Sequence, residues 1–339
     1  MLRLVDRFPS LGAEELIDHL VPPKRFSAVR FETYVPSAEH PSQKAALEAI
    51  RAFAATLHPD AAAPRRRFLR RREEPAGVPG RYLDGGFGVG KTHLLASLWH
   101  ASPEPKAYLT FEELAAVNGF VGMDDAIETF RQFRVVCIDE FELDDVANTL
   151  MVVSFLRGIL PRGVKIAATS NAIPDRLGEG RFNAEDFTRE IAAIASAFEV
   201  FRIDGPDYRA KSRVSAETLD VAEVERLISA AGEVTVDDFG SLLAHLRKVH
   251  PVQFRALIGG LDAVVVHGLA PIANQGEALL FVQLVDELYD AEVAFAATGC
   301  AVHELFPETY RHGGYRKKYG RCESRLAAML GEADRAFLS

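Results

Sequence analysis

A glycine-rich stretch at residues 83–94 is the feature that most constrains what this chain can fold into. It contains the pattern G-x-x-x-x-G-K-T, with Gly85, Gly90, Lys91 and Thr92 in the fixed positions. Glycines allow a tight turn in which successive backbone N–H groups converge on phosphate oxygens. The lysine of such a loop reaches the β- and γ-phosphates, and the threonine hydroxyl ligates Mg²⁺. The stretch therefore predicts a nucleotide site made by Gly85, Gly86, Phe87, Gly88, Val89, Gly90, Lys91, Thr92 and His93.

The sequence on either side of this loop has the strand and helix character that the motif requires. Residues 81–83 are typical of a short strand, and residues 92–101 are typical of a helix with a leucine-rich face. Such a helix directs its positive N-terminal end at the bound anion. A chance glycine-rich turn is the alternative, and the order strand, loop, helix counts against it.

Two acids after an apolar run indicate the hydrolytic part of the same site. Residues 133–138 predict a strand buried on both faces, and Asp139 and Glu140 follow it. Asp139 has the place of the Walker-B acid that holds Mg²⁺ through water. Glu140 has the place of a general base that polarises the attacking water. The pair favours nucleotide hydrolysis over phosphoryl transfer to a small molecule; an ordinary strand-to-turn boundary is the alternative.

Later polar residues are candidates for sensing the γ-phosphate. Asn171 ends a predicted buried strand at residues 163–171 and has the place of the sensor-1 residue that orients water, although it can also simply cap a turn. Arg181 and Arg189 compete for the role of an arginine finger presented to a neighbouring subunit, a device worth about 10³–10⁵ in rate. Surface ion pairing is the alternative for both arginines.

The predicted strands define the fold class. Strands near residues 81, 106, 133, 163 and 198 alternate with helices, which predicts an α/β P-loop NTPase of AAA+ type with a three-layer parallel sheet. Residues 30–36 are predicted to be extended, and a helix is expected from Pro41. Tyr34 and Gln43 are candidates to contact the adenine, with ordinary packing and capping as the alternative. We expect an N-terminal extension at 1–60, the ATPase core at 61–207 and a C-terminal α/β lid or partner region at 208–339.

The C-terminal region has a strand–helix–strand pattern of its own. A strand at 263–267, a helix at 277–289 and a strand at 293–298 have nearly the spacing of the segment from Asp139 to Thr169, with His267 in the place of Asp139. This is either a degenerate repeat without catalysis or convergent patterning. Near the end of the chain, Arg325 is a sensor-2 candidate, with a solvated basic face as the alternative.

Composition and charge limit the remaining function classes. The apolar fraction of 48% is enough for a buried core, and no apolar run is long enough to cross a membrane. The first residues lack the positive-then-apolar pattern of a signal peptide, and the three cysteines form no C-x-x-C motif. We therefore expect a reduced, soluble, cytoplasmic protein. The net charge of −9 argues against broad nucleic-acid binding. A run of six arginines between residues 65 and 72 is either a solvated loop or a docking patch for an acidic partner, an anionic membrane or nucleic acid.

These motifs together resemble the ZapE/Afg-like branch of AAA+ ATPases, particularly its actinobacterial form. The similarity extends over nearly the whole chain. One departure concerns the arginine finger: many members have Gly-Leu-Gln-Arg where this chain has Gly178-Glu179-Gly180-Arg181. Arg181 is the first choice for the finger. The matching stretches are residues 30–34 with 41–43, 86–94, 138–141, 168–171, 207–209, 284–290 and 324–326.

The resemblance implies ATP-dependent association with FtsZ and modulation of the division ring near the inner membrane. Mitochondrial relatives are linked to protein quality control, so remodelling of protein partners is also implied. We expect a Mg²⁺-dependent ATPase that works as a homo-oligomer, with a hexamer as one candidate size, on FtsZ or another division or membrane-associated protein. The alternatives are a nucleic-acid motor or helicase-loader-like ATPase and a nucleotide switch without catalysis. No strong nucleic-acid signal is present.

Overall fold

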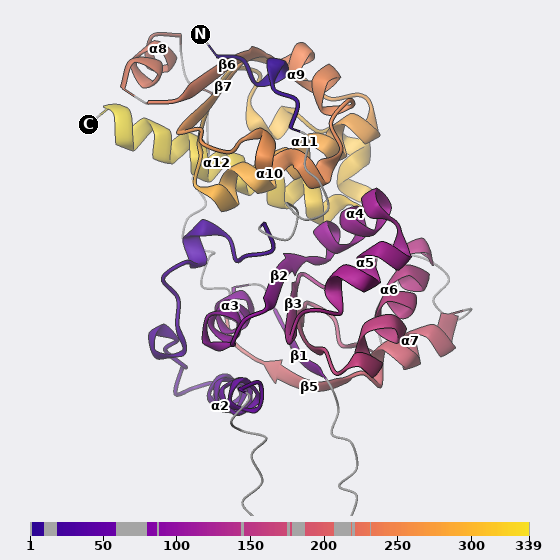
Figure 1. The fold of residues 1–339 in the computed structure, drawn as a ribbon. Helices are drawn as coiled ribbons and strands as arrows, with labels where there is room; N and C mark the ends of the chain where they lie inside the picture. Colours follow the sequence, from indigo (N-terminus) through magenta and orange to yellow (C-terminus); the bar gives the residue numbers. More distant parts are fainter. Residues whose placement is uncertain are drawn as a thin grey trace, which may run out of the picture. The chain divides into compact units, whose positions relative to one another are not determined.

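A computed structural model of the chain separates into two compact units. The P-loop unit contains Leu20–Pro22 and Phe26–Ala210, and the C-terminal unit contains Met1–His19, Pro23–Arg25 and Lys211–Ser339. Figure 1 shows the elements of each unit. The structure describes residues 2–9, 19–58, 80–86, 88–143, 146–174, 177, 187–206, 218, 221–230 and 232–338.

The P-loop unit is built on a five-stranded parallel sheet. Its strand order is β2-β3-β4-β1-β5, and every neighbouring pair is parallel. The carboxyl ends of all five strands therefore meet at one edge, where ligands bind in open α/β sheets. The predicted fold class is confirmed. The strands are β1 (Gly80–Gly85), β2 (Lys106–Thr110), β3 (Val135–Asp139), β4 (Lys165–Ser170) and β5 (Phe198–Ile203).

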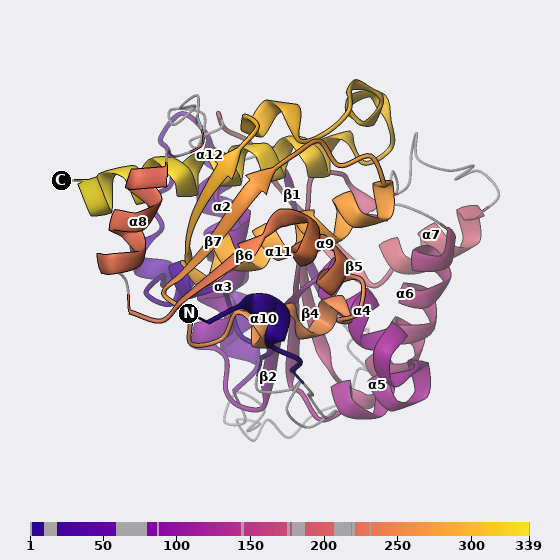
Figure 2. The same ribbon diagram turned by 90° about the horizontal axis from the view of Figure 1, so that it is seen from above.

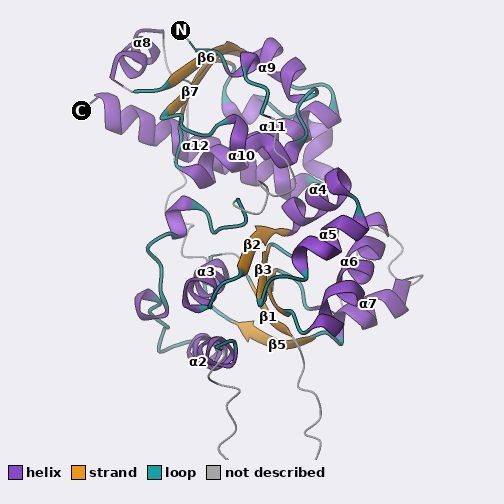
Figure 3. Ribbon diagram, in the orientation of Figure 1, coloured by secondary structure: helices purple, strands orange, loops and turns teal. Residues whose placement is uncertain are grey.

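Helices cover both faces of this sheet, which makes the three predicted layers. Figures 1 and 3 show α2 (Pro41–Thr56) and α3 (Lys91–Ala101) on one side of the sheet. Their apolar faces pack with Leu83, Cys137 and Ala167 of the sheet. Figure 1 shows α4 (Phe111–Val121), α5 (Met123–Phe130), α6 (Val146–Ile159) and α7 (Thr188–Ala195) on the opposite side.

The segment before α2 differs from the extended piece predicted at residues 30–36. Phe31–Thr33 forms a 3₁₀ turn instead. Two local bonds explain it: the Arg30 N–H donates to Thr33 Oγ1 at 3.0 Å, and this hydroxyl donates back to the Arg30 carbonyl at 2.8 Å. A threonine that bonds to nearby backbone in this way competes with strand pairing. The sequence of residues 13–20 predicts a short amphipathic helix, and this segment lies mostly outside the described residues.

The C-terminal unit has a smaller parallel sheet of order β6-β7-β8. Figure 2 shows β6 and β7 side by side. The predicted strand–helix–strand pattern is present as β7, α11 and β8, and the sequence analysis missed β6. The elements are α8 (Val221–Ala230), β6 (Val234–Asp238), α9 (Phe239–Leu246), α10 (Phe254–Leu257), β7 (Ala263–Leu269), α11 (Gln275–Ala291), β8 (Ala294–Gly299) and α12 (Arg316–Leu338).

The first residues of the chain pack into the C-terminal unit, although the sequence analysis set residues 1–60 apart. Leu2 bridges Thr235 as a parallel partner of β6. The buried Asp237 carboxylate accepts hydrogen bonds from the backbone N–H groups of Leu4 at 2.7 Å and Val5 at 3.2 Å. Leu4 itself is fully buried in the apolar core of this unit. Among the described helices of the whole chain, none is both long and apolar enough to cross a membrane.

Candidate nucleotide site

The glycine-rich loop leads from β1 directly into α3, as the motif predicts. Gly90 adopts the left-handed conformation with φ of 93°, and a Cβ atom there would lie 2.6 Å from Cε2 of Tyr34, so only glycine fits. Lys91, the first residue of α3, donates from Nζ to the carbonyl oxygens of Gly85 at 2.9 Å and Gly86 at 2.6 Å. The lysine is therefore held over the loop that would carry the phosphates. Phe87 lies outside the described residues.

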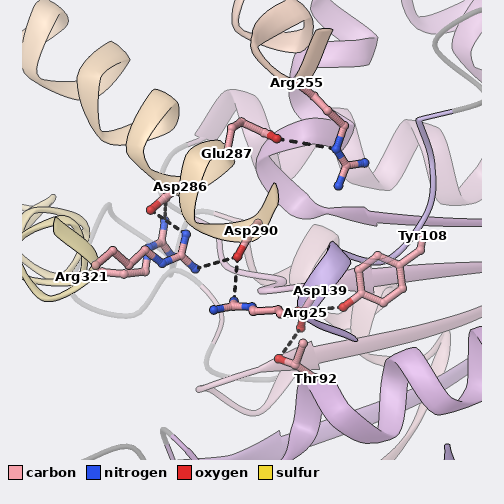
Figure 4. Close-up of polar contacts among 10 residues, drawn as sticks. Arg25, Thr92, Tyr108, Asp139, Arg255, Asp286, Glu287, Asp290 and Arg321 are labelled. Atoms are coloured by element: carbon pink, nitrogen blue, oxygen red, sulfur yellow. Dashed lines mark hydrogen bonds and ion pairs between the residues drawn. The ribbon is translucent and has the colours of Figure 1, made fainter. Parts of the chain in front are cut away.

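Asp139 lies at the carboxyl end of β3 and is fixed by three hydroxyl groups. Figure 4 shows two of them: Thr92 donates to Oδ1 at 3.3 Å, and Tyr108 donates to Oδ2 at 2.9 Å. Thr169 of β4 also donates to Oδ1. Burial raises the pKa of the Asp139 carboxyl above its ordinary value and the adjacent Glu140 raises it further, whereas the three hydrogen bonds lower it.

These oxygens fit a magnesium ion. Mg²⁺ prefers oxygen ligands and is bound through one or two protein groups, water and substrate phosphates. The Thr92 hydroxyl and the Asp139 carboxylate, within hydrogen-bond reach of each other beside Lys91, are the donor set that such an ion requires. Sequence reasoning singled out Thr92 and Asp139 as candidate ligands but missed Tyr108, because nothing in the β2 sequence distinguishes a tyrosine that packs in the core from one that bonds to a carboxylate.

Glu140 has an unusual backbone at the end of the same strand. Its φ of 53° is in the left-handed region, which non-glycine residues adopt rarely. The conformation is held by the Glu140 N–H, which donates to Thr169 Oγ1 at 3.1 Å. Strained residues of this kind occur often at functional sites. The geometry is consistent with the predicted general base, a role that remains a prediction.

Asn171 lies just after β4 and connects the lysine to an acid that the sequence analysis did not single out. Its Oδ1 accepts from Lys91 Nζ at 3.0 Å, and its Nδ2 donates to Glu142 Oε1 at 2.9 Å. Glu142 follows the Asp-Glu pair closely, and that spacing was the one signal in the sequence. The structure thus brings Lys91, Asp139 and Asn171 to the same sheet edge, as predicted.

A cavity opens at this edge. Its volume is about 670 Å³, within the range of small-molecule sites. The walls come from the ends of β1, β4 and β5. Burial raises the pKa of Asp84, one of the lining carboxyl groups, while the nearby cations Arg202 and Lys91 lower it. The lining residues are Asp84, Gly85, Gly86, Asn171, Ala172, Ile173, Arg202, Ile203, Asp204 and Gly205.

The segment ahead of α2 packs onto the loop. The Tyr34 hydroxyl donates to the Val89 carbonyl at 3.3 Å. Gln43 is 2% exposed; its Oε1 accepts from the Ser37 N–H at 2.8 Å and its Nε2 donates to the Asp204 carbonyl at 2.9 Å. These contacts support the packing alternative for Tyr34 and Gln43 over a direct contact with adenine.

His93 fastens the same segment to α3. Its Nε2 lies 2.9 Å from Thr33 Oγ1 and 3.2 Å from the Arg30 carbonyl, and its ring contacts that of Tyr34 edge-on. Because a carbonyl only accepts, Nε2 carries a proton in that contact. Burial lowers the pKa of His93. His93 therefore links the loop helix to the segment that packs on the loop.

The structure does not test the three arginine candidates. Arg181 lies outside the described residues. Arg189 is exposed near the start of α7. Arg325 belongs to α12 of the C-terminal unit, where it is 8% exposed. The finger and sensor-2 roles of these three residues stay predictions.

Arg325 takes part in a cluster of ion pairs within the C-terminal unit. Its Nη1 lies 2.7 Å from Asp286 Oδ1 and its Nη2 lies 3.8 Å from Asp290 Oδ1, with the guanidinium 5.0 Å from the Tyr289 ring centre. Arg25 reaches the same Asp290 at 2.8 Å (Figure 4). Its guanidinium also lies 4.5 Å from the centre of the same Tyr289 ring. We call this cluster the arginine clasp; it consists of Arg25, Asp286, Tyr289, Asp290, Arg321 and Arg325.

The C-terminal unit repeats one detail of the nucleotide site without its acids. In the P-loop unit the Thr169 hydroxyl bonds to both the Asp139 side chain and the Glu140 N–H. In the C-terminal unit the Thr298 hydroxyl lies 3.2 Å from His267 Nδ1 and accepts from the Gly268 N–H at 3.3 Å. The shared geometry favours the degenerate-repeat interpretation.

Comparison with known proteins gives one family and several relatives. The model of the family described as AFG1-like ATPase matches residues 12–231 and 215–334. The cell division protein ZapE of Escherichia coli strain K12 is 26% identical over 311 residues, covering 77% of this chain and 81% of that protein. Lactation elevated protein 1 homolog B of Danio rerio is 26% identical over 95 residues, covering 28% of this chain and 19% of that protein.

Solved structures with similar folds include two replication proteins. The DnaC helicase loader is 18% identical, with a TM-score of 0.38, covering 53% of this chain and 99% of that chain. The replication initiator DnaA bound to AMPPCP and single-stranded DNA is 12% identical, with a TM-score of 0.41, covering 92% of this chain and 94% of that chain. At these TM-scores the likeness adds nothing to the fold already described.

Proposed function

The chain belongs to the AFG1-like ATPase family, and from this premise we propose that its ATP hydrolysis is magnesium-dependent and drives the remodelling or regulation of a protein partner. One observation carries the chemical part: Asp139, held by the Thr92 hydroxyl, lies at the same sheet edge as the Lys91–Asn171 pair. Phosphate-binding, metal-binding and water-orienting groups are thus supplied by three neighbouring strand ends.

Catalysis in this proposal is positioning and charge stabilisation. The backbone of residues 85–90 and the Lys91 ammonium hold the phosphates. Thr92 and Asp139 hold Mg²⁺, which would neutralise charge on the phosphates when bound. Glu140 takes the proton of the attacking water, and Asn171 orients that water. Arg181, or else Arg189, comes from a neighbouring subunit, which requires a homo-oligomer such as a hexamer.

The proposed partner is FtsZ or another cell-division or membrane-associated protein. Support comes from the similarity to the cell division protein of Escherichia coli over 77% of this chain. The protein then acts in the cytoplasm, at the division site or peripherally at the inner membrane. The net charge of −9 opposes the nucleic-acid alternative.

The test is ATP turnover per subunit over a range of protein concentrations, with and without FtsZ polymers. We expect the rate per subunit to rise with concentration, because a finger from a neighbour completes the site, and to change when FtsZ is added. A rate independent of both variables would contradict the shared site and the partner. Salt-dependent binding of labelled single-stranded DNA would instead favour the nucleic-acid alternative.

Replacing Tyr108 tests whether its hydrogen bond stabilises the ionised form of Asp139 that would bind Mg²⁺. In Tyr108→Phe, Oδ2 of a buried carboxylate loses its hydroxyl donor, so the ionised form that binds Mg²⁺ is less favourable. A hydrogen bond to a charged group contributes about 1.5–3 kcal/mol. We expect half-maximal turnover to need at least about tenfold more Mg²⁺, measured by Mg²⁺ titration and by binding of a fluorescent ATP analogue with and without the metal.

The matched control is Tyr310→Phe, which removes a hydroxyl that donates to the Ala273 carbonyl at 2.7 Å in the C-terminal unit. It should leave the Mg²⁺ requirement unchanged. An unchanged requirement in Tyr108→Phe would mean that this hydroxyl only fills space in the core.

A further inference from the structure

We infer that Glu142 is a positioning residue, which sets the orientation of the Asn171 amide and so determines which of its atoms faces the nucleotide. The inference deepens the function proposed above, because it rests on the role of Asn171 in hydrolysis. Glu142 is half-buried and lies two residues beyond Glu140.

The neighbours of Asn171 leave only one orientation for its amide. A lysine ammonium only donates, so the atom that faces Lys91 Nζ at 3.0 Å is the carbonyl oxygen. An ionised carboxylate only accepts, so the atom that faces Glu142 Oε1 at 2.9 Å is the nitrogen. If the amide were turned over, its NH₂ group would face the Lys91 ammonium, which is also a donor. Its oxygen would then face the Glu142 carboxylate, which is also an acceptor. Lys91 and Glu142 together therefore fix the side chain.

This orientation has a consequence for the cavity. With one N–H of Asn171 on Glu142 and the oxygen on Lys91, the second N–H makes no hydrogen bond to the part of the chain that the structure describes. Asn171 lines the cavity of about 670 Å³ together with Gly85 and Gly86 of the phosphate loop. The second N–H is thus the donor that can meet a γ-phosphate oxygen or the attacking water.

The backbone around Glu142 is rigid enough for this purpose. Just before it, the Phe141 N–H donates to the Thr169 carbonyl at 2.7 Å, which pins the segment after β3 to β4. The Phe141 ring is fully buried and packs against Tyr82 and Phe111. Leu143, on the other side of Glu142, is also fully buried. The carboxylate is therefore presented to Asn171 by fixed backbone on both sides.

A double-mutant cycle on turnover tests the inference. We expect Glu142→Ala to lower kcat by about 10-fold or more, the factor associated with one hydrogen bond to a charged group, while the affinity for a non-hydrolysable ATP analogue changes less than about 2-fold. Glu142→Gln keeps an acceptor at the same place, so its kcat should lie between that of the wild-type chain and that of Glu142→Ala. In an Asn171→Ala background, Glu142→Ala should have no further effect, because its target is gone.

The matched control is Glu128→Ala on the surface of α5, where the carboxylate pairs with Arg131 across one helical turn and is 73% exposed. It should keep wild-type kcat. Wild-type kcat in Glu142→Ala, or an undiminished effect in the Asn171→Ala background, would overturn the inference. If Asn171→Ala itself turned over normally, the proposed role of Asn171 would fail instead. Should Glu142→Ala not fold, the Glu142→Gln and Asn171→Ala pair gives the same cycle.

Discussion

Glu140→Gln is expected to bind ATP as tightly as the wild-type chain and to hydrolyse it about 10²–10⁴-fold more slowly, the contribution typical of a positioned general base. The amide keeps the size and the hydrogen-bonding reach of the carboxylate but cannot take a proton from water. The backbone should not change, because the bond that holds its left-handed conformation uses the Glu140 N–H and Thr169 Oγ1, which the substitution leaves in place. Single-turnover hydrolysis and binding of a fluorescent ATP analogue measure the two quantities.

Two controls make this result specific. Glu128→Gln removes a carboxylate from the exposed surface of α5 and should leave turnover unchanged. Lys91→Ala removes the ammonium from the phosphate loop and should weaken nucleotide binding instead. Hydrolysis by Glu140→Gln at the wild-type rate would assign the base to another group and would leave Glu140 as a strand-end residue.

The fold could be predicted from the sequence because its signals are local. The loop glycines, the apolar run before Asp139 and the strand that leads to Asn171 each follow from the order of residue types along a short segment. The parallel sheet then brings their ends together without further information. This is why the sequence indicates Lys91, Asp139 and Asn171 as candidates, and why the structure brings them to the same sheet edge.

Other parts of the site depend on contacts that the order of residues does not contain. The sequence indicates only a core residue of β2 at Tyr108, whereas the structure shows that its hydroxyl donates a hydrogen bond to Asp139. The first residues of the chain join β6 through Asp237, whose partners lie more than two hundred residues away. Thr33 forms a local turn where a β-branched, aromatic segment indicated an extended one. In each case a side chain takes a partner that local propensity does not reveal.

The arginine clasp shows why two C-terminal motifs occur together. Asp286, Tyr289 and Asp290 lie on one face of α11, because residues three and four apart are neighbours on a helix. Arg321 and Arg325 are spaced in the same way on α12, and Arg25 adds a third cation. The motifs at 284–290 and 324–326 thus supply the two sides of one set of contacts. These contacts give Arg325 a structural role that does not require a bound nucleotide.

Arg325→Leu should therefore destabilise the C-terminal unit. Removing one partner of a buried ion pair costs about 3–5 kcal/mol, because the remaining charge stays out of water. Here the carboxylate of Asp286 keeps Arg321 at 2.7 Å and that of Asp290 keeps Arg25 at 2.8 Å, so we expect a loss near the lower limit, about 3 kcal/mol. Native-state hydrogen exchange in α11 and α12 measures this opening free energy in the full chain.

The matched control, Arg247→Leu, breaks a pair with Glu277 in which the arginine is 65% exposed, and exposed pairs contribute at most about 1 kcal/mol. The same two variants separate the clasp from the sensor-2 role. If Arg325 is structural, Arg325→Leu should exchange faster in α11 and α12 and should keep the wild-type affinity for ATP at temperatures where the unit is folded. If Arg325 is instead a sensor-2 residue, Arg325→Leu should leave hydrogen exchange unchanged and slow ATP turnover. In that case the guanidinium would stabilise the γ-phosphate and not the carboxylates of Asp286 and Asp290.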